Sequence, residues 1–420
     1  MVQVPRSPIG RIVGRHVAPH LAEALRDTRV VLVNGARQCG KSTLVAQVAR
    51  DRGLAWYSLD QKTAAESARF DPEGFVRSAP AMVIDEIQRD LGLILPIKSV
   101  VDFDPTPGHF LLTGSSRLAG MRQLPDTLPG RMETIELWPL SQGEIDSEPD
   151  GFVDAAFRDG PDLAIRGEET RADYIERVVR GGFPEAVARQ GRRRRAFHQQ
   201  YAADLVNRDV KQVGEVEFNP ALRKLVRLLA ARSAGILSMD SLASDLGVSG
   251  RTVSRYLSLL EQVFLIKQIP AWAPSASTRA VKAPKVVFVD SGLATSLVPA
   301  DALQLGTAQG PLGGILEGFV VTELARQLTW CRQEVELFHY RTRDKVEVDV
   351  VLRDLAGRVV GIEVKASSTA RSEDFKGLRH LRQRLGDKFV AGYLIYLGQD
   401  TLPMGDRLRT LPLCALWRAH

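Results

Sequence analysis

The sequence has few of the residues that build disulfide frameworks or zinc sites. It contains three cysteines, Cys39, Cys331 and Cys414, and no C-x-x-C pair. So sparse and odd a set argues against a disulfide framework. The seven histidines are scattered, without the spacing that zinc ligands have. These absences exclude the disulfide-rich secreted class and the common zinc-binding modules.

Long apolar runs are also missing. No segment approaches the ~20 apolar residues that a helix needs to span a bilayer. The N-terminus carries Arg6, Arg11 and Arg15 without the apolar core of a signal peptide. We therefore expect a cytoplasmic protein without a membrane partner. The composition, with 25% charged and 44% hydrophobic residues, is that of an ordinary globular protein. A net charge of +6 permits nucleic-acid binding without demonstrating it.

The segment from Gly35 to Thr43 carries a phosphate-binding pattern. Its residues are Gly35, Ala36, Arg37, Gln38, Cys39, Gly40, Lys41, Ser42 and Thr43. The first eight match G-x-x-x-x-G-K-[ST] at every required position, between a β-branched apolar run and a segment with helical spacing. Glycine lets the backbone wrap around phosphates, and the N–H groups at the helix start point at the anion. We predict that this segment binds ATP, with Lys41 at the β- and γ-phosphates and the Ser42 hydroxyl on Mg²⁺.

A second nucleotide signature ends at Glu86. Residues 81–86 are four apolar residues followed by two acids, as in a buried parallel strand that delivers its acids to the C-terminal edge of a sheet. There Asp85 would hold Mg²⁺ through water, and Glu86 would orient or deprotonate the attacking water. One strand, within residues 54–60, separates the two signatures. This order predicts a P-loop ATPase of the additional-strand class, to which AAA-type enzymes belong.

A third predicted strand, residues 109–113, places a polar residue at the same edge. Thr113 ends this strand and is our candidate to face the γ-phosphate and the lytic water. Arg117 and Arg131 are candidates to neutralise charge on the transferred phosphoryl group, within one subunit or from a neighbouring subunit. Each of them can equally be a surface arginine. Because the chain has no obvious second nucleotide domain to receive them, these arginines predict a homo-oligomer.

The middle of the chain is helical and contains one dense basic run. Residues 146–170 are rich in Asp, Glu, Gly and Pro, and we expect a loop-rich connection there. The four arginines from Arg192 to Arg195 could contact nucleic-acid phosphates. We favour a solvated helix face, because no aromatic residues interleave with these arginines.

Residues 238–260 have helix-turn-helix spacing. Two capped helical segments are separated by a glycine turn, and residues 263–266 could add a wing. Five polar side chains of the second segment fall largely off its apolar face: Arg251, Thr252, Ser254, Arg255 and Ser258. They can contact DNA, but such modules also serve only for packing between domains. The residues leave both alternatives open.

The C-terminal part carries an acidic constellation on a helix and two strands. We expect an amphipathic helix over 316–324 and a hairpin of strands over 346–352 and 359–365. Because side chains alternate along a strand and the hairpin is short, polar residues of both strands come together. Such a set suits a divalent Mg²⁺ or Mn²⁺ ion and water attack on a phosphodiester. The alternative is a nuclease-like fold that keeps its acids for structure or nucleic-acid binding. The candidate residues are Glu317, Asp349, Glu363 and Lys365.

With these motifs in place, the chain resembles bacterial and archaeal AAA-type ATPases that are joined to a C-terminal restriction-endonuclease-like domain of unknown function. The matching segments are Gly35–Ser42, Met82–Arg89, Leu112–Ser116, Gly130-Arg131, Gly181–Glu185, Asn207–Asp209, Lys282–Leu293 and Val346–Lys365. The resemblance implies ATP and Mg²⁺ at Lys41, Ser42, Asp85 and Glu86, and nuclease-core positions for Asp349, Glu363 and Lys365. Cys39 stands where a small aliphatic residue is common, but phosphate binding there uses the backbone.

The sequence therefore predicts an α/β protein. It would contain an AAA-type P-loop parallel sheet, then a helical and winged-helix region, then a restriction-endonuclease-like α/β domain. The expected boundaries are 1–145, 146–235, 236–298 and 299–420. The leading functional prediction is Mg²⁺-dependent ATP hydrolysis coupled to DNA binding or processing. The alternatives are a regulatory ATPase switch that acts through protein partners, and a DNA-binding regulator that does not cleave.

Overall fold

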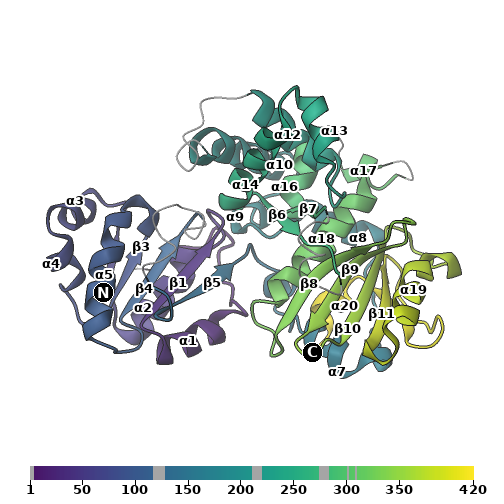
Figure 1. Cartoon of the computed structure of the whole chain (residues 1–420), viewed down its shortest axis with the longest axis horizontal. Helices are drawn as coiled ribbons and strands as arrows, with labels where there is room; N and C mark the ends of the chain where they lie inside the picture. Colours follow the sequence, from purple (N-terminus) through teal and green to yellow (C-terminus); the bar gives the residue numbers. More distant parts are fainter. Residues whose placement is uncertain (1–3, 117–127, 211–219, 274–282, 300–301, 308–309) are drawn as a thin grey trace.

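The computed structural model describes residues 4–116, 128–210, 220–273, 283–299, 302–307 and 310–420. A parallel-sheet domain occupies the N-terminal part, a helical region with a two-stranded hairpin follows, and a mixed-sheet domain ends the chain (Figure 1). Among the described residues, no helix combines the length and the apolar character needed to cross a membrane.

The N-terminal sheet is parallel throughout. Its described strands are β1 (Val30–Gly35), β2 (Ala55–Ser58), β3 (Met82–Asp85), β4 (Phe110–Gly114) and β5 (Met132–Leu137). They lie in the order β2-β3-β4-β1-β5, and every neighbouring pair is parallel. Strand β4 therefore lies between the strands that carry the two nucleotide signatures. This is the predicted additional-strand arrangement.

Helices cover both faces of this sheet. The elements are α1 (Ala18–Asp27), α2 (Lys41–Arg52), α3 (Lys62–Phe70), α4 (Pro72–Val76), η1 (Ile87–Arg89), η2 (Leu91–Leu93) and α5 (Ile94–Phe103). Val31 and Val33 of β1 bury in one apolar cluster with residues of α1 and α2. Val30 and Leu32 bury in another with residues of α4 and α5. This alternation is what a strand with two covered faces requires.

The middle region is mainly helical. It contains α8 (Arg171–Arg180), α9 (Pro184–Val187), α10 (Gly191–Asp204), the π-helix η5 (Leu205–Asp209), α12 (Pro220–Ala231), α13 (Met239–Leu246), α14 (Gly250–Gln262), β6 (Ile266–Ile269), β7 (Lys285–Phe288), α16 (Ser291–Leu297) and α17 (Ala302–Leu305). The expected caps of α13 and α14 are present, because Ser238 and Ser249 accept backbone N–H groups of their first turns. The wing strand starts at Ile266, later than expected, and pairs antiparallel with β7.

The C-terminal sheet is mixed. Its elements are α18 (Leu312–Gln327), β8 (Val335–Arg341), β9 (Glu347–Asp354), β10 (Val359–Lys365), η6 (Ser372–Phe375), α19 (Lys376–Leu385), η7 (Gly386–Lys388), β11 (Phe389–Tyr396), β12 (Leu408–Pro412) and α20 (Ala415–Arg418). The order is β12-β11-β10-β9-β8, in which β8, β9 and β10 are antiparallel and β10, β11 and β12 are parallel. The predicted hairpin is the β9–β10 pair.

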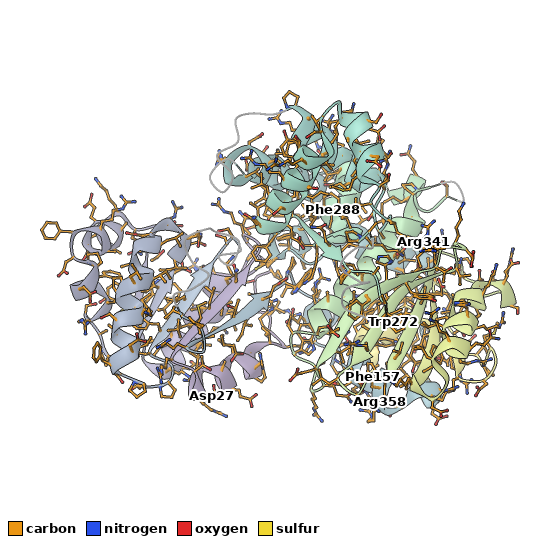
Figure 2. All side chains as sticks on the ribbon, viewed as in Figure 1. Asp27, Phe157, Trp272, Phe288, Arg341 and Arg358 are labelled. Atoms are coloured by element: carbon orange, nitrogen blue, oxygen red, sulfur yellow. The ribbon has the colours of Figure 1, made fainter. Side chains whose placement is uncertain are left out.

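The expected loop-rich connection over residues 146–170 is confirmed only in part, since residues 163–170 form no regular element but helices precede them. The segment continues α6 (Gln142–Asp146) and contains α7 (Phe152–Arg158) and η4 (Gly160–Asp162), and α7 packs on the C-terminal domain (Figure 1). Figure 2 places Phe157 beside Arg358, whose guanidinium lies 5.7 Å from the centre of the Phe157 ring. The charge-rich composition concealed a short apolar helix, which packs against α18, α20 and β11.

Helix α18 is a buried helix and not the expected amphipathic one. Only Gly313, Gly314 and Glu317 of its sixteen residues are not fully buried. It contacts β10 and β7 as well as α7, α8, α16 and α20, so nearly all of its surface meets other elements. A helix that other elements cover on every side needs no polar face. Its buried polar side chains, such as Glu323, are hydrogen-bonded instead.

Candidate functional site

The phosphate loop joins β1 to α2 with the geometry that the motif requires. Gly40 has a φ of +105°, a left-handed conformation that favours glycine. A Cβ on Gly35 would lie 2.1 Å from the Leu137 carbonyl oxygen, so no larger residue fits there. The Lys41 ammonium lies inside the loop and donates to the Gly35 and Ala36 carbonyl oxygens at 2.9 and 2.8 Å. The loop therefore presents backbone N–H groups and one cation to an anion.

Asp85 lies at the end of β3, next to the start of α2. The Ser42 hydroxyl donates to Asp85 Oδ1 at 3.2 Å, and the Thr113 hydroxyl donates to the same oxygen at 2.6 Å. The Ser58 hydroxyl reaches Asp85 Oδ2 at 3.4 Å. Burial raises the pKa of Asp85, and the hydrogen bond from Thr113 opposes that rise. The structure thus brings Ser42 and Asp85 together, as Mg²⁺ binding requires.

Glu86 is held by residues that the sequence reasoning missed. It adopts a left-handed backbone conformation, with φ of 61°. Its carboxylate accepts a hydrogen bond from the Ser115 hydroxyl at 2.6 Å and another from the Gln88 amide. The Gln88 amide also donates to Ser115 Oγ at 2.8 Å. Both partners lie within the Met82–Arg89 and Leu112–Ser116 segments, but their spacing alone did not single them out.

Thr113, the candidate to face the γ-phosphate, contacts both acids. It is fully buried, and its hydroxyl accepts the Glu86 N–H at 2.9 Å while donating to Asp85. It therefore positions the two acids from behind. Ser115 is the polar residue after this strand that reaches the Glu86 carboxylate.

Two elements outside the motif support the loop. Arg15, which precedes α1, donates to the Cys39 carbonyl at 3.0 Å and pairs with Glu144 at 2.9 Å. On the other side the Tyr201 hydroxyl of α10 donates to the Arg37 carbonyl at 3.1 Å. A cavity of about 240 Å³ lies between the loop and the end of α10, and Arg208 of the π-helix lines it. π-Helical turns often mark functional sites.

The two predicted arginines have different outcomes. Arg117 lies outside the described residues. Arg131 precedes β5, and its carbonyl accepts the Val30 N–H at the N-terminal edge of the sheet. The phosphate loop lies at the C-terminal edge, a strand length away. Arg131 also pairs with Asp102 of α5 at 2.5 Å. It does not reach the phosphate loop of its own subunit in this arrangement, so a role toward a neighbouring subunit and an ordinary surface ion pair are the two remaining alternatives.

The predicted acidic constellation forms, but around a lysine. The Lys285 ammonium of β7 contacts the Glu317 carboxylate and lies 3.3 Å from Asp349 Oδ1, and its side chain is only 5% exposed. Asp349 Oδ2 accepts the Val364 N–H at 3.0 Å. Lys365 turns toward Asp374 instead, at 3.5 Å, with its side chain 43% exposed. Lys285 thus stands between two acids that were predicted to bind a metal.

Burial and the close approach of the acids shift the pKa values of this cluster. Burial raises the pKa of Glu317 to about 8, and the Asp349 charge adds to the rise. Burial and the Asp349 charge also hold the pKa of Glu363 well above its usual range. For Lys285, burial lowers the pKa, but the charges of Asp349 and Glu317 outweigh it and the net pKa is raised. Across the described ranges, no group of three or more His, Cys, Asp or Glu side chains is arranged to hold a metal ion.

Family models match three successive parts of the chain. Residues 27–146 match an AAA domain. Residues 171–304 match a domain of unknown function (DUF8612), and residues 312–416 match another (DUF4143). The first match, together with the parallel sheet and the phosphate loop, confirms the predicted AAA-type P-loop ATPase domain. The last agrees with the expectation that the C-terminal domain belongs to a group of unknown function.

Relatives over the whole chain carry no assigned activity. Uncharacterized proteins of Mycobacterium tuberculosis and Mycobacterium bovis are each 28% identical to this chain over 405 residues, 95% of this chain and 83% of theirs. Among solved structures, a Walker-type ATPase of Pyrococcus abyssi aligns with a TM-score of 0.44 and 14% identity over 71% of this chain and 99% of that chain. The similarity to the mycobacterial proteins runs through all three parts of the chain.

Proposed function

We propose that this chain binds ATP with Mg²⁺ and hydrolyses it, with Glu86 acting on the attacking water. The observation that carries the proposal is the convergence of Lys41, Ser42, Asp85 and Glu86 at one edge of the parallel sheet. Ser42 and Asp85, 3.2 Å apart, would hold the metal, which supplies charge neutralisation for the phosphates. Lys41 adds a second positive charge inside the loop. Glu86, with its carboxylate oriented from two sides, would hold the water for in-line attack.

We assign Arg208 a further contact with the bound nucleotide. It lines the cavity beside Arg37 and Gln38 of the phosphate loop. A guanidinium at that place would stabilise negative charge on the phosphates from within the same subunit. The Tyr201 contact with the loop keeps α10 close to the site.

We assign Arg131 to the ATP of a neighbouring subunit. Its position at the edge of the sheet opposite its own phosphate loop supports this assignment, because an arginine there can reach a transferred phosphate only in trans. Its partner Asp102 is 31% exposed, so this pair is at the surface and open to exchange.

A subunit-mixing experiment tests the trans assignment. Arg131→Ala and Lys41→Ala should each lose most ATPase activity, since an arginine supplied to the transferred phosphate contributes about 10³-fold or more. Mixed together, they should recover activity far above either variant alone, because an intact Lys41 site meets an intact Arg131. Phosphate release across a range of mixing ratios measures this recovery. No recovery at any ratio, with wild type fully active as a monomer, would exclude the trans role.

A buried polar network on α18 links the ATPase domain to the rest of the chain. Glu323 accepts the Gln142 N–H at 3.0 Å, directly after the sheet of the ATPase domain. Arg326 contacts Glu323 and lies 3.8 Å from Asp290, which accepts the Gly182 N–H at 2.6 Å. All of these side chains are at most 2% exposed. This network supports coupling between ATP binding in the N-terminal domain and the β6–β7 hairpin, because Asp290 closely follows β7.

We further propose that the coupled ligand is DNA, bound by helix α14 in a winged-helix module. Arg251, Ser254, Arg255 and Ser258 are exposed on α14, while Val253 and its apolar neighbours are buried. Helices α12, α13 and α14, followed by the β6–β7 hairpin, are the helices and the wing that such a module contains. The exposed arginines would contact phosphates.

One set of assays on three proteins tests the coupling. Wild type is expected to hydrolyse ATP faster when duplex DNA is added, Lys41→Ala to hydrolyse little with or without DNA, and Asp349→Ala to keep the DNA response. None of the three should cut DNA, because Lys285 fills the acidic cluster. A DNA-independent wild-type rate would remove DNA as the coupled ligand. Metal-dependent cutting that Asp349→Ala loses would instead establish a nuclease.

The Lys285 contacts favour a second candidate, a regulatory ATPase whose C-terminal domain binds partners without cleavage. A restriction-endonuclease-like core would need its acids free for a metal, and two of them contact a lysine here. In that case hydrolysis would respond to a protein partner and not to DNA.

A further inference from the structure

A pocket that opens to solvent lies at the beginning of α10, away from the phosphate loop. Its volume is about 310 Å³, and α8, α10, α16 and α17 all contribute to its lining. Arg192 and Arg208 are sixteen residues apart along consecutive helical segments, which corresponds to more than ~20 Å at 1.5 Å per residue. The pocket is therefore distinct from the nucleotide site.

The basic run forms one wall of this pocket. The expectation of a solvated face holds for Arg192 and Arg193, which are exposed, but fails for Arg194. The Arg194 side chain is 6% exposed, pairs with Glu176 at 2.6 Å and donates to the Arg189 carbonyl at 2.9 Å. Arg195 donates to the Val298 carbonyl at 2.8 Å. In the part of the chain that the structure describes, Arg192 makes no hydrogen bond or ion pair.

The charges of the lining leave a positive excess. Arg192, Arg194 and Arg195 line the pocket, and Glu176 is the one acid among the lining residues. Two positive charges thus remain uncompensated by the wall. A phosphate monoester carries about −1.5 to −2 at neutral pH and accepts the forked hydrogen bonds of arginine. A carboxylate would balance only half of this charge.

His198 lines the same pocket, with the Arg180 backbone near its ring. It is 1% exposed, and neither of its ring nitrogens makes a hydrogen bond of normal geometry. The ring packs on Gly292, where a Cβ would lie 2.4 Å from Nε2. Burial lowers the pKa of His198, although the Asp290 charge and the Arg180 backbone oppose this. With the Arg180 backbone beside the ring, a buried imidazole still retains a ring nitrogen without a partner of normal geometry, and leaving it unpaired costs stability.

We propose that this pocket binds a small organic phosphate monoester. Its phosphate would contact Arg192 and its arginine neighbours, and a polar group of its body would bond to His198. The volume suits a molecule of sugar-phosphate size and excludes a nucleic-acid duplex. The site is independent of ATP hydrolysis and of DNA binding.

Titration calorimetry on full-length protein tests the site. Lys41→Ala serves as the parent, so that its disabled phosphate loop does not compete for the probes, which are inorganic phosphate and glucose 6-phosphate. Adding Arg192→Gln should weaken the binding of both probes about tenfold or more, the loss of one charge-assisted contact. The matched control is Arg193→Gln, an exposed arginine of the same run outside the pocket, which should bind as the parent does.

A second readout reports on the pocket floor. Adding glucose 6-phosphate should shift the NMR signal of the His198 ring, assigned by its absence in His198→Asn. No binding of either probe would overturn the proposal. Equal weakening by Arg192→Gln and Arg193→Gln would also overturn it, because it would indicate a diffuse surface charge.

Discussion

Replacing Glu86 with glutamine is expected to slow ATP hydrolysis by about 10²- to 10⁴-fold, the usual contribution of a general base. Glutamine keeps the size and the hydrogen bonds of the side chain but cannot accept a proton from water. The metal-binding pair Ser42 and Asp85 is untouched, so ATP should bind with nearly unchanged affinity. The loss should therefore fall on kcat and not on binding.

Steady-state phosphate release and binding of a fluorescent ATP analogue separate the two effects. Lys41→Ala is the contrasting variant, since it should weaken nucleotide binding itself. Ser115→Ala is the matched control, because it removes the 2.6 Å hydrogen bond that orients Glu86 and the one that Ser115 accepts from Gln88 but keeps the carboxylate, so it should cost much less than Glu86→Gln. Hydrolysis by Glu86→Gln at the wild-type rate would remove Glu86 from the assigned role.

Lys285→Met is expected to destabilise the packing of β7 on the C-terminal domain by about 3–5 kcal/mol, the typical effect of breaking a buried ion pair from one side. The acids would lose the cation that contacts Glu317 and lies 3.3 Å from Asp349. Methionine fills similar volume, so the loss would come from charge and not from a cavity. Hydrogen exchange of β7 and β9 peptides measures the local free energy of opening.

Two variants give this prediction its controls. Lys267→Met on the paired strand β6 should cost about 1 kcal/mol or less, because Lys267 reaches Glu136 at 3.5 Å with 29% of its side chain exposed. Adding Asp349→Asn to Lys285→Met should recover stability by removing the unpaired charge. Calorimetric titration with Mn²⁺ should give identical curves for wild type and for the Asp349→Ala, Glu363→Ala double variant. A site present only in wild type would mean that a metal displaces Lys285.

The ATP site was largely predictable from the sequence because its motifs are local. Gly35 to Ser42 is continuous, and each glycine is demanded by a nearby contact or by a left-handed φ. Asp85 lies forty-three residues from Ser42, but a parallel sheet brings strand ends to one edge, so the meeting followed from strand order. The hydrogen bonds of Gln88 and Ser115 to Glu86 could not be predicted in this way, because the directions of these side chains depend on the backbone turn after each strand.

The acidic residues of the C-terminal cluster were predictable from the sequence, but the cation that contacts them was not. Glu317, Asp349 and Glu363 come together because a helix and a hairpin are recognisable locally. Lys285 belongs to a strand thirty-two residues before Glu317, and nothing in a lone lysine indicates that it is buried among acids. Only the docking of the β6–β7 hairpin on the C-terminal domain decides that the cation is a lysine.

By itself the sequence determined the α/β class, the strands and loop that build the ATP site, and the residues available to each site. These depend on periodicity, on glycine geometry and on short spacings, which act over one or two elements. The tertiary structure alone decided that α7 joins the C-terminal domain, that Arg131 lies far from its own phosphate loop, and that Lys285 lies between two acids of the cluster. Such features depend on contacts between distant segments, where burial changes the energy of a charge and packing selects its partner.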